Sequence, residues 1–343
     1  MAGYSQAIDV IGPAFGRTTK QLFQPFRLGH WLRLSVVSLL TWEFAGGGFN
    51  LNIPGPTGGD SSEELVAAAV PTLPVIVAAG VAVIVLFLFL TYVAAVFRFV
   101  LFDSVLHDRC RIAEGWSRWQ RQGRSLFWWW LGFTVVLLIA MALLIGLPIG
   151  LAWLEGVFDA PGEHVLLLVA GGIALFFALM ALIVGSMVIH VAVKDWVVPL
   201  MAMEDRGVLR GFQQLIPMLR TNWPAYLLFI LMKALLALGS AIFFTILYLI
   251  LALSILVPFI LTGIVAGVVG QAAGITWSPL VIATVSVIGG IVIVIVLYGM
   301  AFIYTPAMVF FQSYALCFFG TQYPKLGEAI AAADSSGVPP GAG

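Results

Sequence analysis

The sequence is poor in charge and rich in apolar residues. Only 9% of its 343 residues are charged and 62% are hydrophobic, whereas soluble domains carry roughly 25% charged residues. The mean hydropathy is +1.08. These values exclude a soluble globular protein and indicate an integral membrane protein. The 16 basic and 16 acidic residues cancel, so net charge gives no reason to expect nucleic acid as a partner.

Cysteine and catalytic signatures are scarce as well. Cys110 and Cys317 are too few for a disulfide framework, and neither falls in a metal-binding pattern. The chain contains no HExxH, no GxSxG and no Walker-type glycine loop, and its four histidines are scattered. We therefore expect no enzymatic activity, no metal site and no cofactor.

Long apolar runs predict the architecture. A helix needs about 20 mostly apolar residues to cross the hydrocarbon core, and lipid cannot satisfy the open backbone groups of an isolated strand. The sequence therefore predicts an all-α polytopic membrane protein with six transmembrane helices. The six predicted spans are residues 28–46, 73–100, 126–154, 165–193, 224–255 and 279–312.

The distribution of basic residues predicts the orientation. The connections 47–72 and 155–164 contain acidic residues and no lysine or arginine. The segment before the first span and the connections 101–125 and 194–223 are basic, and arginine and lysine near span ends stay on the cytoplasmic side. We therefore expect a multi-pass protein of the cytoplasmic (inner) membrane with both termini in the cytoplasm.

The cytoplasmic segments contain an internal similarity. A shift of 96 residues places Gly115-Trp116 on Gly211-Phe212 and Arg124 on Arg220. A shift of 97 places Asp108-Arg109 on Asp205-Arg206, and Ala14-Phe15 starts a third copy.

This similarity predicts three tandem units, each an interfacial amphipathic helix followed by a transmembrane hairpin. The units cover about residues 5–106, 107–203 and 204–316 of a single membrane domain, residues 1–332. The small and polar tail, 333–343, is expected to be disordered.

The repeated helices carry candidate lipid contacts. In the second copy Ile112, Trp116 and Trp119 share one arc that the arginines avoid, and in the third Leu209, Phe212, Ile216 and Leu219 do the same. Helices with one basic and one apolar face lie at the membrane interface, where they either anchor the hairpins or bind lipid headgroups. The candidate headgroup contacts are Arg111, Arg118, Arg121, Arg124 and Arg220.

Four further residues are candidate functional or structural polar sites. Lys233 falls inside a predicted span, where it either serves function or extends its amine toward the interface. Arg98 and Asp195 occupy equivalent span ends at the 97-residue shift and carry opposite charge. Pro199 removes the helical partner of the Asp195 carbonyl, which predicts a bend there. We expect Arg98 and Asp195 to form an ion pair.

Several short segments carry a family resemblance. The chain reads Asp195-Trp196-Val197-Val198-Pro199-Leu200-Met201, then Gly211-Phe212, then Asn222-Trp223-Pro224-Ala225-Tyr226-Leu227-Leu228, and Gln24-Pro25-Phe26-Arg27-Leu28-Gly29-His30-Trp31 begins its first span. These segments resemble bacterial and archaeal polytopic membrane proteins of unknown function, distantly similar to the membrane domain attached to some glycerophosphodiester phosphodiesterases. The resemblance implies a helical membrane fold and no established activity.

The preferred interpretation is a non-enzymatic membrane protein that binds lipid or partner membrane proteins through its cytoplasmic interfacial helices. The alternative is a transporter or channel for a small solute. Transport requires polar groups along the spans, and apart from Lys233 these offer mainly isolated hydroxyls such as Ser240, Thr245 and Ser286. This scarcity favours the first interpretation.

Overall fold

The structure is a computed structural model that describes residues 6–24, 26–41, 73–108, 110–160, 162–272 and 279–336, and its regular elements in these ranges are all helices. Those of the first half are α1 (Gln6–Asp9), α2 (Ile11–Phe23), α3 (Leu28–Thr41), α5 (Leu73–His107) and α6 (Ile112–Leu154). Those of the second half are α7 (Val165–Ala192), α8 (Val198–Glu204), α9 (Val208–Ala272), α10 (Pro279–Gln322) and α11 (Pro324–Ser336). The predicted all-α fold is confirmed for this part of the chain.

Five helical segments are long and apolar enough to cross a membrane. They are Val77–His107, Ile112–Leu154, Val165–Glu204, Val208–Gly270 and Ala283–Gln322. The chain is therefore a multi-pass membrane protein. The first predicted span, 28–46, coincides with α3 as far as Thr41, and its remainder lies outside the described residues. This first span, and with it the total of six, stays a prediction.

The chain divides into two compact units, each built from segments far apart in sequence. The first unit contains residues 1–10, 118–232 and 315–343, and the second contains residues 11–117 and 233–314. The division cuts α6, α9 and α10, so the units do not follow the boundaries of the predicted repeats.

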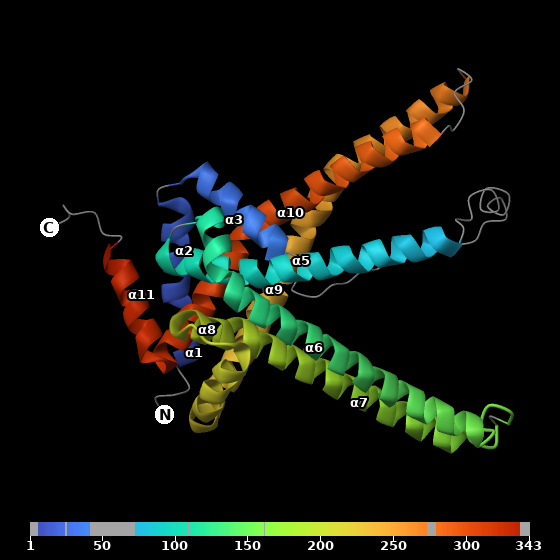
Figure 1. Ribbon diagram of the computed structural model, residues 1–343, viewed down its shortest axis with the longest axis horizontal. Helices are drawn as coiled ribbons and strands as arrows, with labels where there is room; N and C mark the ends of the chain where they lie inside the picture. Colours follow the sequence, from blue (N-terminus) through green and yellow to red (C-terminus); the bar gives the residue numbers. More distant parts are fainter. Residues whose placement is uncertain are drawn as a thin grey trace. The chain divides into compact units, whose positions relative to one another are not determined.

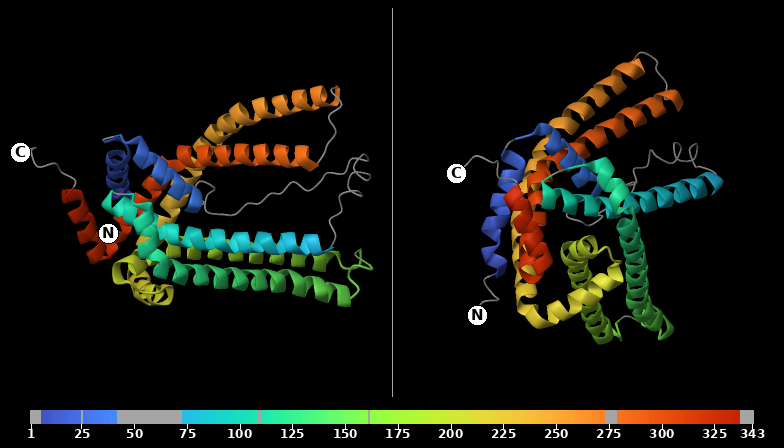
Figure 2. Two further views of the ribbon diagram at one scale, coloured as in Figure 1. Left: turned by 45° about the horizontal axis from the view of Figure 1, so that its top comes forward. Right: turned by 60° about the vertical axis from the view of Figure 1, so that its left-hand side comes forward.

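In the first unit α6 and α7 form a hairpin. The two helices lie side by side in both sets of views (Figures 1 and 2). Gly156, in the connection between them, adopts φ 68. This left-handed backbone favours glycine because a Cβ atom would meet the following carbonyl oxygen.

A π-helical turn, Val193–Val197, joins α7 to α8. Pro199 has no N–H to donate to the carbonyl four residues earlier, so an ordinary helix would leave the Asp195 carbonyl unpaired. The π-helical turn ends two residues before Pro199, at the position where the sequence predicts a bend. Trp196, in the turn, packs edge-to-face on Tyr226 of α9 with 4.8 Å between ring centroids. Phe229 stacks on Phe318 of α10 at 4.4 Å, which extends this aromatic core.

The second unit contains a second long helix pair. The part of α9 after Lys233 and the part of α10 before Tyr314 lie side by side (Figure 1). They approach closely at Gly299, where an added Cβ atom would lie 2.9 Å from Leu251 Cδ2. α3 packs on α5, and its Ser35 hydroxyl lies 3.1 Å from the Thr305 hydroxyl of α10.

The predicted interfacial helices are joined to the spans that follow them. α9 departs from helical geometry at Asn222 (φ −128, ψ 33), two residues before Pro224, so residues 208–221 form a distinct first segment. α6 is helical from Ile112 to Leu154, and 43 residues correspond to about 65 Å, twice the ~30 Å hydrocarbon thickness. The first turns of α6 therefore extend beyond the hydrocarbon.

Candidate functional site

Two three-helix junctions share a local geometry. One joins α2, the end of α5 and the start of α6, within the second unit; the other joins α6 from Arg118, α8 and the start of α9, within the first unit. In each, a left-handed aspartate follows the ending helix: Asp108 has φ 52 and Asp205 has φ 50. Aspartate is among the few residues that adopt this conformation at a helix end.

Each junction also contains a glycine that packs against a valine. An added Cβ atom at Gly115 would lie 3.0 Å from Val100 Cγ2, and one at Gly211 would lie 2.8 Å from Val197 Cγ1. These glycines allow α6 and α9 to approach the preceding helix closely. The similarity is local, and the threefold tandem arrangement stays a prediction.

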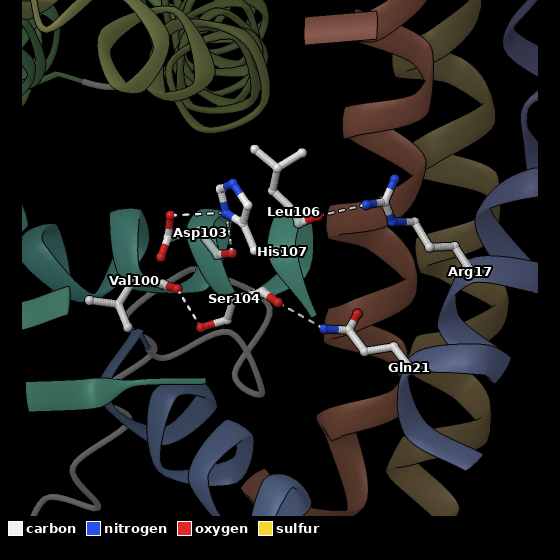
Figure 3. Close-up of polar contacts among 7 residues, drawn as sticks. All are labelled: Arg17, Gln21, Val100, Asp103, Ser104, Leu106 and His107. Atoms are coloured by element: carbon white, nitrogen blue, oxygen red, sulfur yellow. Dashed lines mark hydrogen bonds and ion pairs between the residues drawn. The ribbon is translucent and has the colours of Figure 1, made fainter. Parts of the chain in front are cut away.

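At the α2–α5–α6 junction, α2 caps the end of α5 (Figure 3). Arg17 donates from Nη2 to the Leu106 carbonyl at 2.8 Å, and Gln21 donates from Nε2 to the Ser104 carbonyl at 2.9 Å. The last four carbonyls of a helix have no partner within it, and a cation there is favourable for the helix dipole. Both side chains therefore hold α2 against α5.

At the α6–α8–α9 junction, α6 holds the residues that follow α8. Gln122 donates from Nε2 to Asp205 Oδ1. One turn further along α6, the Ser125 hydroxyl accepts the N–H of Val208 at 3.4 Å, where α9 begins. The link from α8 to α9 is thereby fixed on the side of α6.

A pocket of about 360 Å³ lies at this junction, and we call it the α6–α8 pocket. It is lined by Arg118, Trp119, Arg121, Gln122, Ala202 and Asp205. The Arg118 guanidinium lies 4.9 Å from the Trp119 ring centroid, a cation–π geometry that orients it. Arg121 Nη1 lies 3.6 Å from Asp205 Oδ2. The pocket therefore combines two cations with one carboxylate.

The arginines of the pocket are accessible to an anion. The side chains of Arg121 and Asp205 are 77% and 65% exposed, and an exposed ion pair of this kind contributes at most about 1 kcal/mol. Arginine binds phosphate or carboxylate oxygens with two parallel N–H donors. This arrangement suits anion binding. Within the described ranges, no group of three histidine, cysteine or acidic side chains is placed to hold a metal.

A second polar cluster surrounds Glu204, the last residue of α8. Its Oε1 accepts a hydrogen bond from the Tyr323 hydroxyl at 2.7 Å, and its Oε2 accepts one from Gln214 Nε2 of α9 at 2.6 Å. Arg206 Nε and Lys325 Nζ lie 3.4 and 3.6 Å from the same carboxylate. Only 11% of the Glu204 side chain is exposed. This cluster fastens α8 to the starts of α9 and α11.

The environment of Tyr323 stabilises its protonated form. Burial, and then the hydrogen bond to Glu204, raise the pKa of Tyr323 to about 12. The hydroxyl therefore remains a donor throughout the physiological pH range. Sequence reasoning aligned Asp205 with Asp108 and missed Gln122, Glu204 and Tyr323, because nothing in the local pattern distinguishes these from ordinary surface polar residues.

The structure brings together two of the five predicted headgroup contacts, Arg118 and Arg121. Arg111 instead pairs with Glu114, three residues along the same helix, at 2.9 Å. Arg124 and Arg220 are exposed and do not line the pocket.

The other predicted polar residues are not among those that line the pocket. Lys233 and Arg98 are half-buried, Pro199 is buried, and Asp195 is 1% exposed. Arg98 belongs to the second unit and Asp195 to the first. Their ion pair stays a prediction.

The first α9 segment exposes part of its predicted apolar arc. Leu209 is 68% exposed and Ile216 is 45% exposed, whereas Val208, Gly211 and Leu215 are buried. The close approach of Gly211 to Val197 sets which face of the helix packs against the protein. In α6 Trp119, a member of the predicted apolar arc, is 4% exposed.

Comparisons with known proteins identify a family and no activity. No curated protein and no solved structure matches the chain. The expected similarity to the glycerophosphodiester phosphodiesterase membrane domain therefore has no support from them. A family model matches residues 5–328, nearly the whole chain, and the protein belongs to the family of unknown function DUF7544.

Proposed function

We propose that this protein is a non-enzymatic, multi-pass protein of the cytoplasmic (inner) membrane that binds anionic lipid headgroups, or partner membrane proteins, through its cytoplasmic helices. Both termini lie in the cytoplasm in this proposal. The basic residues between spans support that orientation, because the connections 47–72 and 155–164 contain none.

The observation that carries the proposal is the arrangement of arginine on α6. Arg118, Arg121 and Arg124 are exposed on the turns where Trp119 and Leu126 are buried. These turns precede Trp128-Trp129-Trp130, a tryptophan run typical of a membrane interface. A basic residue near an anionic membrane surface contributes about 1 kcal/mol of attraction.

The first segment of α9 supports the same function. Its exposed Leu209 and Ile216 lie on a helix that also exposes Arg210 and Arg220. Exposed apolar side chains interspersed with arginine are typical of helices that lie at the headgroup boundary. We infer that this segment contacts the membrane surface.

Lipid retention tests the proposal. The full-length protein is reconstituted in vesicles of phosphatidylcholine and phosphatidylglycerol, extracted gently, and analysed by native mass spectrometry. We expect it to retain phosphatidylglycerol preferentially, and the combined variant Arg118→Gln, Arg121→Gln, Arg124→Gln to lose that preference. The matched control, Ser117→Ala with Gln120→Ala, changes exposed polar residues of the same helix and should retain it. Equal lipid ratios in the wild type and the arginine variant would refute lipid binding by α6.

Cysteine labelling tests the orientation. In a variant without Cys110 and Cys317, a membrane-impermeant thiol reagent applied to intact cells should label Gly162→Cys and leave Gln120→Cys unlabelled. Both positions are exposed, so burial does not confound the comparison. Labelling of Gln120→Cys before lysis would place the arginines of α6 outside the cell and overturn the topology.

A further inference from the structure

We propose that the α6–α8 pocket binds a phosphate ester that carries its own hydrogen-bond donor, as a phosphatidylglycerol headgroup or free glycerol phosphate does. This inference rests on the proposed function, because it specifies the ligand class for part of the same arginine surface. It also goes further, since it confines recognition to one pocket.

The cations of the pocket match a phosphate. Arg118 is oriented by the Trp119 ring at 4.9 Å. Arg121 lies 3.6 Å from the Asp205 carboxylate, which is beyond hydrogen-bonding distance. Both guanidinium groups therefore keep N–H donors for an anion, and arginine forms paired hydrogen bonds with phosphate oxygens.

The hydrogen-bond acceptors in the pocket favour a ligand that has a hydrogen-bond donor. Asp205 receives the Gln122 amide on Oδ1, so its Oδ2 has lone pairs available. Gln122 is 9% exposed, and its buried Oε1 has no hydrogen-bond partner among the described residues. Buried polar atoms in proteins almost always find a partner. A hydroxyl beside the phosphate would supply donors to this side of the pocket.

The pocket is also of suitable size and construction. Its volume, about 360 Å³, is within the ~300–1,000 Å³ usual for small-molecule sites. The Gln122–Asp205 and Ser125–Val208 hydrogen bonds hold α6 against the α8–α9 link. The lining is therefore organised before a ligand arrives, which reduces the ordering cost of binding.

One side of the pocket offers a way to block it without changing its charge. Ala202, on α8, is half-exposed and lines the pocket. In Ala202→Leu the larger side chain would fill part of the volume and leave both arginines in place. This variant separates binding inside the pocket from attraction to the arginine surface as a whole.

The experiment measures lipid binding to the delipidated full-length protein in detergent by native mass spectrometry. The probes are dihexanoyl phosphatidylglycerol and dihexanoyl phosphatidylmethanol, an equally anionic lipid with the same chains and a phosphate diester but no donor on its headgroup. We expect phosphatidylglycerol to bind at least about tenfold more tightly than phosphatidylmethanol, and Ala202→Leu and Arg118→Gln each to weaken phosphatidylglycerol binding about tenfold. The control Arg210→Gln removes an exposed arginine outside the pocket and should change binding less than about twofold.

A competition arm distinguishes the two sources of the ligand. Displacement of phosphatidylglycerol by millimolar glycerol 3-phosphate would support a pocket that takes the soluble ester, and the absence of displacement would support one that requires the membrane lipid. Circular dichroism checks the folding of each variant. If Ala202→Leu does not fold, the test of the pocket rests on Arg118→Gln. This variant should fold, because Arg118 is exposed.

The inference is overturned if phosphatidylmethanol binds as tightly as phosphatidylglycerol, or if a folded Ala202→Leu binds like the wild type. In the latter case, continued loss of lipid in the combined α6 arginine variant would leave the proposed function standing. If neither variant changes lipid binding, both proposals fail.

Discussion

At the α2–α5–α6 junction α2 donates hydrogen bonds to the end of α5, whereas at the α6–α8–α9 junction α6 donates one to the residue that follows α8. The residues involved have matching positions. Arg17 and Gln21 stand in the same register from the start of α2 as Arg118 and Gln122 from the start of α6. Each junction also contains a left-handed aspartate and a glycine packed on a valine.

The two junctions differ in what the matching residues contact. Arg17 and Gln21 are hydrogen-bonded to the Leu106 and Ser104 carbonyls. At the second junction Gln122 bonds a side chain instead, and Arg118 and Arg121 line an open pocket. The 97-residue shift also aligns the buried Val105 with Ala202, whose smaller side chain leaves room there. The first junction is thus a structural cap, and the second has the groups for ligand binding.

The largest stability effect should come from the geometry that the junctions share. Gly211→Val would place Cβ 2.8 Å from Val197 Cγ1, and overpacking of this kind costs about 1–3 kcal/mol. Gly115→Val should cost somewhat less, because its nearest contact is 3.0 Å. The measurement is the unfolding free energy in detergent, with Gly132→Val as the control at an open helix position. If Gly211→Val unfolds like Gly132→Val, the packing does not define the junction.

The next prediction separates the junctions. In Gln21→Met the buried Ser104 carbonyl loses its donor, which costs about 1–3 kcal/mol. In Gln122→Met the partner is the exposed carboxylate of Asp205, which water can solvate, so the loss should stay below about 1 kcal/mol. Lipid binding should show the reverse order, with Gln122→Met the more affected. Equal stability losses at the two positions would remove the distinction between cap and pocket.

A smaller effect concerns the residue before each left-handed aspartate. His107 pairs locally with Asp103 at 3.2 Å, whereas Glu204 bonds Tyr323 of a distant segment. Tyr323→Phe should therefore destabilise the protein by about 1 kcal/mol. At the first junction His107→Ala removes the contact with Asp103. This change should destabilise the protein less, because His107 is exposed.

The same hydrogen bond predicts a pH dependence. The pKa of Tyr323 is about 12 in the folded protein and 10 without its neighbours. A raised tyrosine pKa stabilises the folded state below pH 10, and that stabilisation is lost as the pH rises from 10 through 12. Unfolding measured between pH 8 and pH 11.5 should show this decline in the wild type and less of it in Tyr323→Phe. Identical pH profiles would exclude Tyr323 as the titrating group.

The smallest effect should come from changing charge without changing backbone. Asparagine adopts the left-handed conformation as readily as aspartate. Asp108→Asn and Asp205→Asn should therefore each alter the unfolding free energy by less than about 0.5 kcal/mol. Alanine, which disfavours this conformation, should cost more at both positions. A large loss in the asparagine variants would show that charge, not conformation, maintains the helix ends.

Much of the fold follows from the sequence because the bilayer imposes it. Apolar runs of sufficient length identify all five candidate spans of the described residues, and Pro199 marks the irregular turn before α8. Hydropathy places the end of the fifth predicted span near residue 255, whereas α9 continues through Pro258 to Ala272. In a soluble protein the glycines and the proline of this segment would indicate a loop, but a transmembrane helix tolerates both residue types.

The candidate site was less predictable, because its meaning depends on contacts between distant segments. Arg118 and Arg121 stand out by charge on an apolar background. Gln122 becomes significant only when α8 lies beside α6, and Glu204 only when α11 reaches it.

The left-handed backbone at Asp108 and Asp205 limits how the family can vary. A β-branched residue at φ near 50 is sterically disfavoured, whereas glycine, asparagine and aspartate are tolerated. Substitutions at these two positions among family members should therefore be confined largely to those three residues, even where the surrounding apolar residues exchange freely. A valine or isoleucine at either position would identify a chain that connects its helices differently.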